Sequence, residues 1–355
     1  ATNRHDHDRE PSTEIPMPFL PGNLYVDQPL TRAAVAGMQK ADNFIAMQMF
    51  PRLIVDKPSG IYHKWLLADL NRNEMVARAD NAPARVATFG KEDATYSVPT
   101  ESLAYDLNDT VRAAASTALN PAIVIPQLLG YKALIRLEAQ VGALFSSSLW
   151  YRTVSGGASD SVTEGTTSTR KRFSDSSTDP IAALLQEIEF QSKLSGFEPD
   201  ALAFGRKAWT SFRTNPYVLA SLSGTGGVIR NRPATLEEVA ALLGLRWVGV
   251  SKAIYNSAGQ NKPAVNARIV PEDSALLYYR GAAGADPGEW TDAMPTAATC
   301  QVWADGAGNR EGVRIRRFRD EKAGAGGSDH SEIDTFRTCG VVTSLMGTLF
   351  EDMTA

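Results

Sequence analysis

The chain has 355 residues and a formal net charge of −4, with 43% apolar and 21% charged residues. This length allows two or three domains and a sizeable core, and the composition is that of a folded protein. The acidic balance argues against a nucleic-acid-binding protein of the basic-patch kind.

Membrane and secretion signals are lacking in the sequence. No apolar run is long enough to span a bilayer, and the polar N-terminus has no signal-peptide core. Cys300 and Cys339 are the only cysteines and lie far apart, so they predict neither a disulfide framework nor a zinc site. This cysteine usage fits a reducing compartment.

Residues 1–30 are polar and punctuated by prolines, which predicts an extended arm because proline has no backbone donor. Such an arm cannot bury its own apolar residues, so we expect it to lie along the body of the protein or along a neighbour. Residues 31–50 follow with a helical pattern, for which Thr31 is a candidate N-cap. A short strand is expected at 51–55.

Residues 56–98 predict a long two-stranded excursion. Its strand-like stretches, 61–67 and 95–101, are rich in aromatic and β-branched residues, and turn formers lie between them. Four charged residues are interspersed among the turn formers: Arg72, Glu74, Arg78 and Arg85. A lone two-stranded ribbon is marginally stable in water, so something outside the ribbon must hold it.

The longest helical pattern, residues 121–147, follows, and the other segments are organised around it. Pro121 or Pro126 suits a first helical position, where the missing N–H has no consequence. Lys132, Arg136 and Gln140 lie four apart and predict a polar line along one face. The apolar stripe on another face consists of Leu128, Leu134, Ile135, Leu137, Val141, Leu144 and Phe145.

Residues 151–180 are rich in Ser, Thr and Gly and predict a linker or a mobile surface loop. A compact, mixed α/β unit is expected after it, because helical and strand patterns alternate there. Asp179 and Gly196 flank one predicted helix as its N-cap and C′ residues, and Thr235 and Glu238 form a capping box at another.

The tail returns to strand patterns. Residues 299–320 predict a hairpin with Asp305 and Asn309 at its tip, and 333–350 supply the last strands. One face of the strand at 313–319 is strongly basic, with Arg314, Arg316, Arg317 and Arg319. These arginines are interpreted as a solvated face or as partners of acidic residues on another subunit. Direct DNA binding ranks third, because Phe318 is the only stacking residue among them.

No catalytic signature is recognised, since the sequence has no P-loop, HExxH, GxSxG or CxxC motif. The glycine-rich 223–227 lacks the strand-before, helix-after context of a phosphate loop. Residues 5–8 (HDHD) are interpreted as a solvated tail, and 329–332 (DHSE) as a surface loop. His63 is expected to be satisfied or exposed. We therefore predict no catalytic, cofactor-binding or metal site, and the unsupported arm and ribbon favour an assembly protein over an enzyme.

Five segments carry a resemblance. They read FPRLIVDKPSGIYHKW at 50–65, RNEMVARADNAPARV at 72–86, ATYSVPTESLAYDLND at 94–109, DPIAALLQEIEFQSKLSGFEPDALAFGRKAWTSFRTNPYV at 179–218 and TLEEVAALLGLRWVGVSKAIYN at 235–256. Their order and spacing resemble those of the major capsid proteins of tailed double-stranded DNA phages, which have the Hong Kong 97-type fold.

This resemblance runs from Val26 to the C-terminus and implies an α+β capsid fold. The implied parts are an N-terminal arm (1–55), an extended loop over a neighbouring subunit (56–98), a peripheral domain (99–179 and 296–355) with a spine helix at 121–147, and an axial domain (180–295). The tip at Asp305 and Asn309 would lie near local three-fold contacts. The chain leaves no room for a long N-terminal scaffolding segment, so a separate scaffolding protein or a cleaved precursor is implied.

The resemblance further implies a shell protein that assembles into pentamers and hexamers around double-stranded DNA, without sequence-specific contact. Implied partners are further copies of the chain, a scaffolding protein, a portal protein and a decoration protein, with no membrane and no cofactor. The implied location is the virion capsid, assembled in the host bacterial cytoplasm. The predicted subunit-interface residues are Tyr62, Lys64, Trp65, Arg72, Glu74, Arg78, Arg85, Lys132, Arg136, Asp305, Asn309, Arg314 and Arg316.

Two alternatives stay open. An encapsulin-like nanocompartment would have the same fold, with a lumen that binds a cargo peptide in place of DNA. A soluble hydrolase using Asp, His and Glu groups ranks lower, because the sequence carries no hydrolase motif.

Overall fold

The computed structural model describes residues 39–65, 69, 71–78, 80, 83–88, 90–114, 121–223, 232–259, 261–281, 295–304, 312–321 and 326–355. The arm at 1–38, the glycine-rich motif beyond Ser223 and the tip residues Asp305 and Asn309 lie outside these residues. Predictions made for them stay predictions. In the described part of the chain, no helix is long and apolar enough to cross a membrane.

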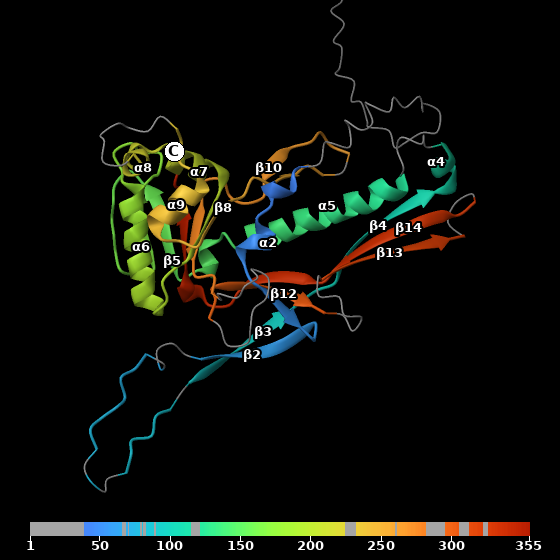
Figure 1. Ribbon diagram of the computed structural model, residues 1–355. Coiled ribbons are helices and arrows are strands. Elements are labelled where there is room, and N and C mark those ends of the chain that lie inside the picture. The colour runs from blue at the N-terminus through green and yellow to red at the C-terminus, as the bar shows by residue number, and fades with distance from the viewer. Residues whose placement is uncertain are drawn as a thin grey trace, which may run out of the picture.

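A long helix, α5 (Pro121–Gly142), links a six-stranded sheet at one end of the molecule to a three-stranded sheet at the other (Figure 1). It ends five residues earlier than the predicted 147. At Gly142 the chain passes so close to Ile269 that an added Cβ atom would lie 2.7 Å from the Ile269 carbonyl oxygen. Only glycine fits such an approach, and the chain turns there.

The predicted apolar stripe of α5 is confirmed in its second half and is wrong in its first. Leu128 is 44% exposed, and Leu129 is buried in its place. The two halves of α5 pack on different sheets, so their buried residues do not form one continuous stripe along the helix. The buried residues of the second half and the turn after it are Leu137, Val141, Leu144 and Phe145.

The six-stranded sheet has the order β6-β5-β16-β11-β7-β8. Its strands are β5 (Arg152–Gly157), β6 (Thr167–Lys171), β7 (Ala201–Phe204), β8 (Trp247–Val250), β11 (Ala275–Tyr278) and β16 (Gly347–Glu351). The prediction of a linker or mobile loop at 151–180 is therefore wrong, because β5 and β6 form a parallel pair within it. The sheet also joins segments predicted to be peripheral with segments predicted to be axial.

Four helices accompany this sheet: α6 (Pro180–Ser195), α7 (Arg206–Thr214), α8 (Pro216–Ser221) and α9 (Leu236–Leu243). Both predicted sets of caps are confirmed. The Asp179 carboxylate accepts from two backbone N–H groups at the start of α6, and Gly196 ends it with a left-handed conformation. Thr235 and Glu238 form a complete capping box at the start of α9.

The sheet is covered on both faces, because neighbouring side chains of a strand point to opposite sides. Leu202, Phe204 and Leu277 belong to a core shared with α6, α7 and α9. Ala203, Leu276 and their neighbours belong to a second core, which the end of α5 and the short helix α2 (Ala46–Met49) complete. The N-terminal segment therefore forms part of the interior.

The three-stranded sheet at the far end of α5 has the order β13-β14-β4, with β4 (Glu101–Asn108), β13 (Val313–Asp320) and β14 (Ser328–Thr335). The predicted hairpin at 299–320 is wrong. β13 pairs with β14, whereas β12 (Ala298–Trp303) lies between β1 (Arg52–Val55) and β15 (Arg337–Val341). The short helix α4 (Asp109–Ala114) follows β4, and β9 (Ile254–Asn256) pairs with β10 (Asn266–Arg268).

Cys300 and Cys339 form a disulfide, so the prediction that they give no disulfide framework is wrong. They are direct partners in the antiparallel register of β12 and β15, with their Cα atoms 4.1 Å apart. The pair could not be predicted from the sequence because the two cysteines are 39 residues apart. The bond closes the root of the segment that contains β13 and β14.

Of the predicted helix at 31–50, the structure describes residues 39–50, where only α2 is α-helical and a 3-10 turn (Ala41–Asn43) precedes it, so one continuous helix over this part is wrong. Phe44, Ile45 and Ala46 are all buried. Three consecutive residues cannot share one face of a helix, so burying them requires an irregular backbone. The strand predicted at 51–55 is confirmed as β1.

The predicted two-stranded excursion is confirmed. β2 (Ser59–Trp65) and β3 (Lys91–Ser97) pair antiparallel as a sheet of their own, which projects from the body (Figure 1). The described residues between the two strands, 71–78 and 83–88, extend beyond it without regular structure. The strand predicted at 95–101 is split at Pro99, which separates β3 from β4.

Candidate interaction surfaces

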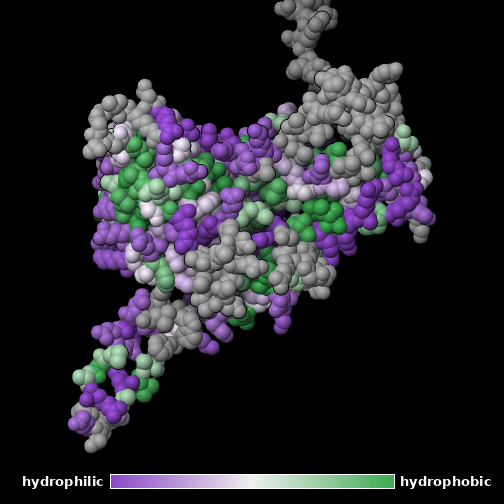
Figure 2. Space-filling view, viewed as in Figure 1, coloured by the Kyte–Doolittle hydropathy of each residue, from purple (hydrophilic) through white to green (hydrophobic). Residues whose placement is uncertain are grey.

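The most exposed apolar side chains lie in the projecting segment. Met75 is 95% exposed, Val86 84% and Val76 69%. They belong to the loop between β2 and β3, and none of them is part of a hydrophobic cluster of the described residues. Figure 2 shows apolar side chains on this loop, which stands off the body. Sequence reasoning selected the charged residues of this loop and missed these three, although apolar residues within a run of turn formers are themselves a signal.

The charged residues predicted at this interface are also placed on the loop and its ribbon. Arg72 donates to Asp69 at 2.9 Å and to Glu74 at 3.3 Å, whereas Arg78 and Arg85 are exposed. On β2, the Lys64 ammonium lies 5.5 Å from the ring centre of Tyr62. Burial raises the pKa of the Tyr62 hydroxyl. Trp65 ends the same strand.

The polar line on α5 binds the chain's own sheets. The Arg136 Nε atom lies 2.9 Å from both carboxylate oxygens of Glu101 at the start of β4, and this hydrogen bonding raises the pKa of Arg136. The Gln140 side chain donates to the Arg337 carbonyl oxygen at 3.3 Å. Lys132 is exposed and makes no side-chain hydrogen bond or ion pair with the part of the chain that the structure describes, so of the three it is the residue most accessible to a second molecule.

The arginines of β13 have carboxylate partners within the same chain. Arg314 Nη2 lies 3.1 Å from Asp334, Arg316 Nη2 3.1 Å from Glu332, and Arg317 Nη2 2.8 Å from Asp329. Arg319 pairs with Asp109 at the start of α4. The strand is therefore neutralised by its neighbours, and an interface there would not depend on four unpaired positive charges.

These pairs stabilise the ionised carboxylates. The hydrogen bond from Arg317 holds the pKa of Asp329 below its ordinary value, and the one from Arg319 does the same for Asp109. At Asp334, burial would raise the pKa, but hydrogen bonds from Ser102 and Arg314 outweigh it and the pKa is lowered. Residues 329–332 lie in β14, so the prediction of a surface loop there is wrong. His330 packs against the Phe318 ring and hydrogen-bonds Asp106.

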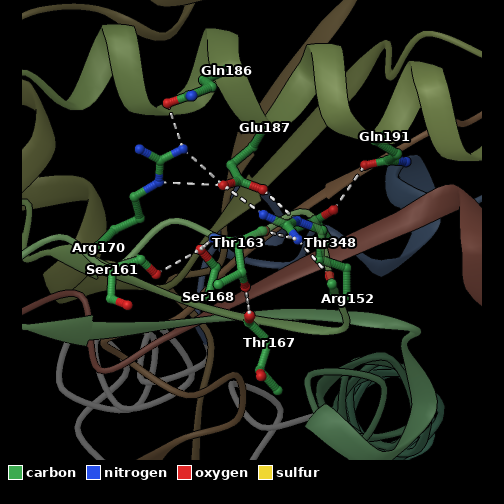
Figure 3. A network of polar contacts seen from close by, with 11 residues as sticks. Arg152, Ser161, Thr163, Thr167, Ser168, Arg170, Gln186, Glu187, Gln191 and Thr348 are labelled. Atoms are coloured by element: carbon green, nitrogen blue, oxygen red, sulfur yellow. Dashed lines mark hydrogen bonds and ion pairs between the residues drawn. The ribbon is translucent and has the colours of Figure 1, made fainter.

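A second arginine–carboxylate group consists of three buried side chains, and Figure 3 shows their contacts. Glu187 on α6 accepts from Arg152 of β5 at 2.6 Å and from Arg170 of β6 at 3.0 Å. Arg152 also donates to the Thr163 and Gly165 carbonyl oxygens, which fixes the connection between β5 and β6. This buried triad holds the edge of the six-stranded sheet against its helix.

Among the residues that the structure describes, no group of three His, Cys, Asp or Glu side chains is placed to hold a metal ion. His63 pairs with Asp93 across the ribbon, where both side chains are more than half exposed.

No protein-family model matches the chain, and no curated protein matches it. Solved structures do. A phage-related protein from Bordetella bronchiseptica is 16% identical, with a TM-score of 0.60 over 92% of this chain and 97% of that one. The capsid of cyanophage P-SCSP1u is 11% identical, with a TM-score of 0.55 over 86% and 87% of the two chains.

The mature capsid of bacteriophage PhiM1 gives a TM-score of 0.54 at 10% identity, over 88% of each chain. Such low identities establish a shared fold and nothing finer. The likeness extends over nearly the whole length of each structure, including the mixture of helices and sheets described above. The chain therefore has the α+β, Hong Kong 97-type capsid fold.

Proposed function

We propose that this chain is the major capsid protein of a tailed double-stranded DNA phage. In this proposal its copies form pentamers and hexamers that close into an icosahedral shell. The proposal is supported by the fold, since the solved structures described as a cyanophage capsid and a mature phage capsid share it. It assigns the chain a structural role and no catalytic one.

The observation that carries the proposal is the projecting loop. Met75, Val76 and Val86 are exposed on a segment whose described residues include no core to receive them. Burying one such side chain fully contributes roughly 1.5–3 kcal/mol. An isolated subunit forgoes this stabilisation, whereas a subunit covered by a neighbour gains it, so the loop suits an assembled state.

The predicted interface fits this arrangement. In the proposal the ribbon and loop at 56–98 lie over a neighbouring subunit. Of the predicted arm at 1–55, α2 and β1 belong to the subunit's own body, so the interlocking contacts are proposed for the residues before 39. Charged residues around the apolar tip, including Arg78 and Arg85, would set register more than affinity. Further partners are a scaffolding protein, a portal protein and a decoration protein, with packaged DNA inside the virion.

The test is assembly of the purified full chain, followed by light scattering and electron microscopy. We expect closed particles from the wild type and only free subunits or capsomers from Met75→Asp with Val76→Asp. Val265→Asp is the matched control, because Val265 is also exposed and lies on the loop between β9 and β10. A wild type that stays monomeric at high concentration and in polyethylene glycol would overturn the proposal.

The content of particles made in a bacterial host separates the two kinds of shell. Nuclease-protected double-stranded DNA is expected for a phage capsid. Particles that instead retain a cargo protein and no nucleic acid would identify an encapsulin-like compartment.

A further inference from the structure

The middle of α5 contains a fully buried carboxylate, Glu138. No cation among the described residues forms an ion pair with it. Burial raises the pKa of Glu138, and the hydrogen bonds from Ser251, Ala46 and Ile45 oppose that rise. An apolar residue at this position would avoid the unfavourable desolvation of a carboxylate. The hydrogen bonds that Glu138 makes must therefore explain why a carboxylate lies here.

Those contacts come from two segments that are far from α5 in the sequence. The Oε2 atom accepts from the backbone N–H groups of Ile45 at 3.0 Å and Ala46 at 2.9 Å. The Oε1 atom accepts from the Ser251 hydroxyl at 2.6 Å. We call residues 39–50 the arm base and residues 251–254 the sheet loop, because the latter directly follow β8 of the six-stranded sheet.

The arm base and the sheet loop also bind each other beside Glu138. Gln39 accepts from the Ile254 backbone N–H at 2.9 Å and donates to the Tyr131 hydroxyl of α5 at 2.8 Å. The Lys252 N–H donates to the Asn43 carbonyl oxygen at 3.0 Å. Each of the three segments is thus bonded to both of the others.

We propose that Glu138 is a latch that makes the arm base and the sheet loop dock on α5 as one unit. Its two oxygens accept hydrogen bonds from different segments. If either segment leaves, the buried carboxylate therefore loses a hydrogen-bond donor. A buried charged acceptor that loses its donors is strongly destabilised, which gives the docking an all-or-none character. The inference concerns the single chain and does not require a shell.

The geometry also says which substitution preserves the latch. A hydrogen-bond donor in place of Oε1 can donate to the Ser251 oxygen, which reverses the direction of that bond. The oxygen at the Oε2 position still accepts from both N–H groups. Glu138→Gln can place its amide nitrogen at this position and keep all three contacts. Glu138→Ala removes all three and leaves a cavity.

Hydrogen exchange of backbone amides in the full chain tests the coupling. We expect Glu138→Ala to speed exchange at least about tenfold in both the arm base and the sheet loop, because each segment loses its hydrogen bonds to a charged acceptor. Glu138→Gln should stay near the wild type. Arg136→Ala, on the outer face of the same helix, is the control and should leave both segments unchanged.

Ser251→Ala keeps the proposal testable if Glu138→Ala does not fold. It removes a donor of the sheet loop alone, yet it should speed exchange at Ile45 and Ala46 in the arm base. Unchanged exchange at these two amides, or a Glu138→Ala effect confined to one segment, would overturn the latch. Equal damage from Glu138→Gln and Glu138→Ala would overturn the assigned hydrogen-bond geometry.

Discussion

Two arginine–carboxylate groups in this chain use the same chemistry at opposite levels of solvation. In the buried triad, the side chains of Glu187, Arg152 and Arg170 are all less than a tenth exposed. On β13, the arginine side chains are 38–48% exposed. The first group lies between a sheet and a helix, and the second lines the outer strand of a sheet.

The difference shows that the presence of an ion pair does not by itself tell how much the pair contributes to stability. Removing one partner of a buried pair leaves an uncompensated charge in the interior. Removing one partner of an exposed pair leaves a charge that water and salt can screen. We therefore expect the triad to decide whether the six-stranded sheet forms, and the β13 pairs to tune the surface.

Glu187→Ala is expected to have the largest effect, a loss of about 3–5 kcal/mol in the free energy of unfolding, because both buried arginines lose their carboxylate. Urea denaturation of the full chain measures it. Glu189→Ala, an exposed position on the same helix, is the control. A loss below 1 kcal/mol for Glu187→Ala would show that the triad is solvated in solution, and the comparison would fail.

Removal of the Cys300–Cys339 disulfide tests how much a covalent link contributes beside these ion pairs. The disulfide joins β12 and β15, which flank the segment with β13 and β14. The segment it closes spans 39 residues, so its loss should lower the free energy of unfolding by about 2–4 kcal/mol. The measurement compares the wild type with Cys300→Ser plus Cys339→Ser, each with and without reductant. Reductant should shift only the wild type. If it leaves the wild type unchanged, the covalent link contributes nothing.

Arg316→Ala should have a small effect, about 0–1 kcal/mol, because the Arg316 side chain is 48% exposed and Arg314 still pairs with the buried Asp334. The difference from the wild type should shrink further as salt is raised. Urea midpoints at low and high ionic strength give the result. A salt-independent loss above 2 kcal/mol would place this arginine with the buried triad.

The smallest effect is expected for Asp329→Asn, on the stability of the protein at acidic pH. The folded pKa of Asp329 lies below its ordinary value near 3.8, so the stability that it contributes is present above pH 3.8 and is lost as the pH falls through the folded pKa. Asp329→Asn should flatten the fall in stability between pH 5 and 2, and Glu189→Gln should not. Identical acid profiles for all three proteins would contradict the pairing with Arg317.

Local features of the fold could be predicted from the sequence. The caps at Asp179 and Thr235 were correct because a cap depends on residues within one turn. The ribbon was recognisable because aromatic and β-branched stretches flank a run of turn formers. The loop residues Arg72 and Arg78 lie where they were expected, although their role at an interface stays a prediction.

Pairings over long distances could not be predicted. β12 lies parallel to β1, about 250 residues earlier, and no local pattern records that choice. The Ser/Thr-rich stretch at 151–180 folds because Arg152 and Arg170 meet Glu187 on another element. The roles of Glu138 and of the cysteines depend on the same kind of remote contact, so spacing along the chain could not reveal them.

The place of the last strand has a consequence for biosynthesis. β16, which ends at Glu351, lies between β5 and β11, and Leu349 and Phe350 are fully buried in the two cores. The sheet therefore stays divided until β16 has emerged from the ribosome, and its two apolar parts cannot pack together before then. Until that point the nascent chain exposes apolar surface that chaperones can bind, so any reaction that needs the folded sheet must follow the synthesis of β16.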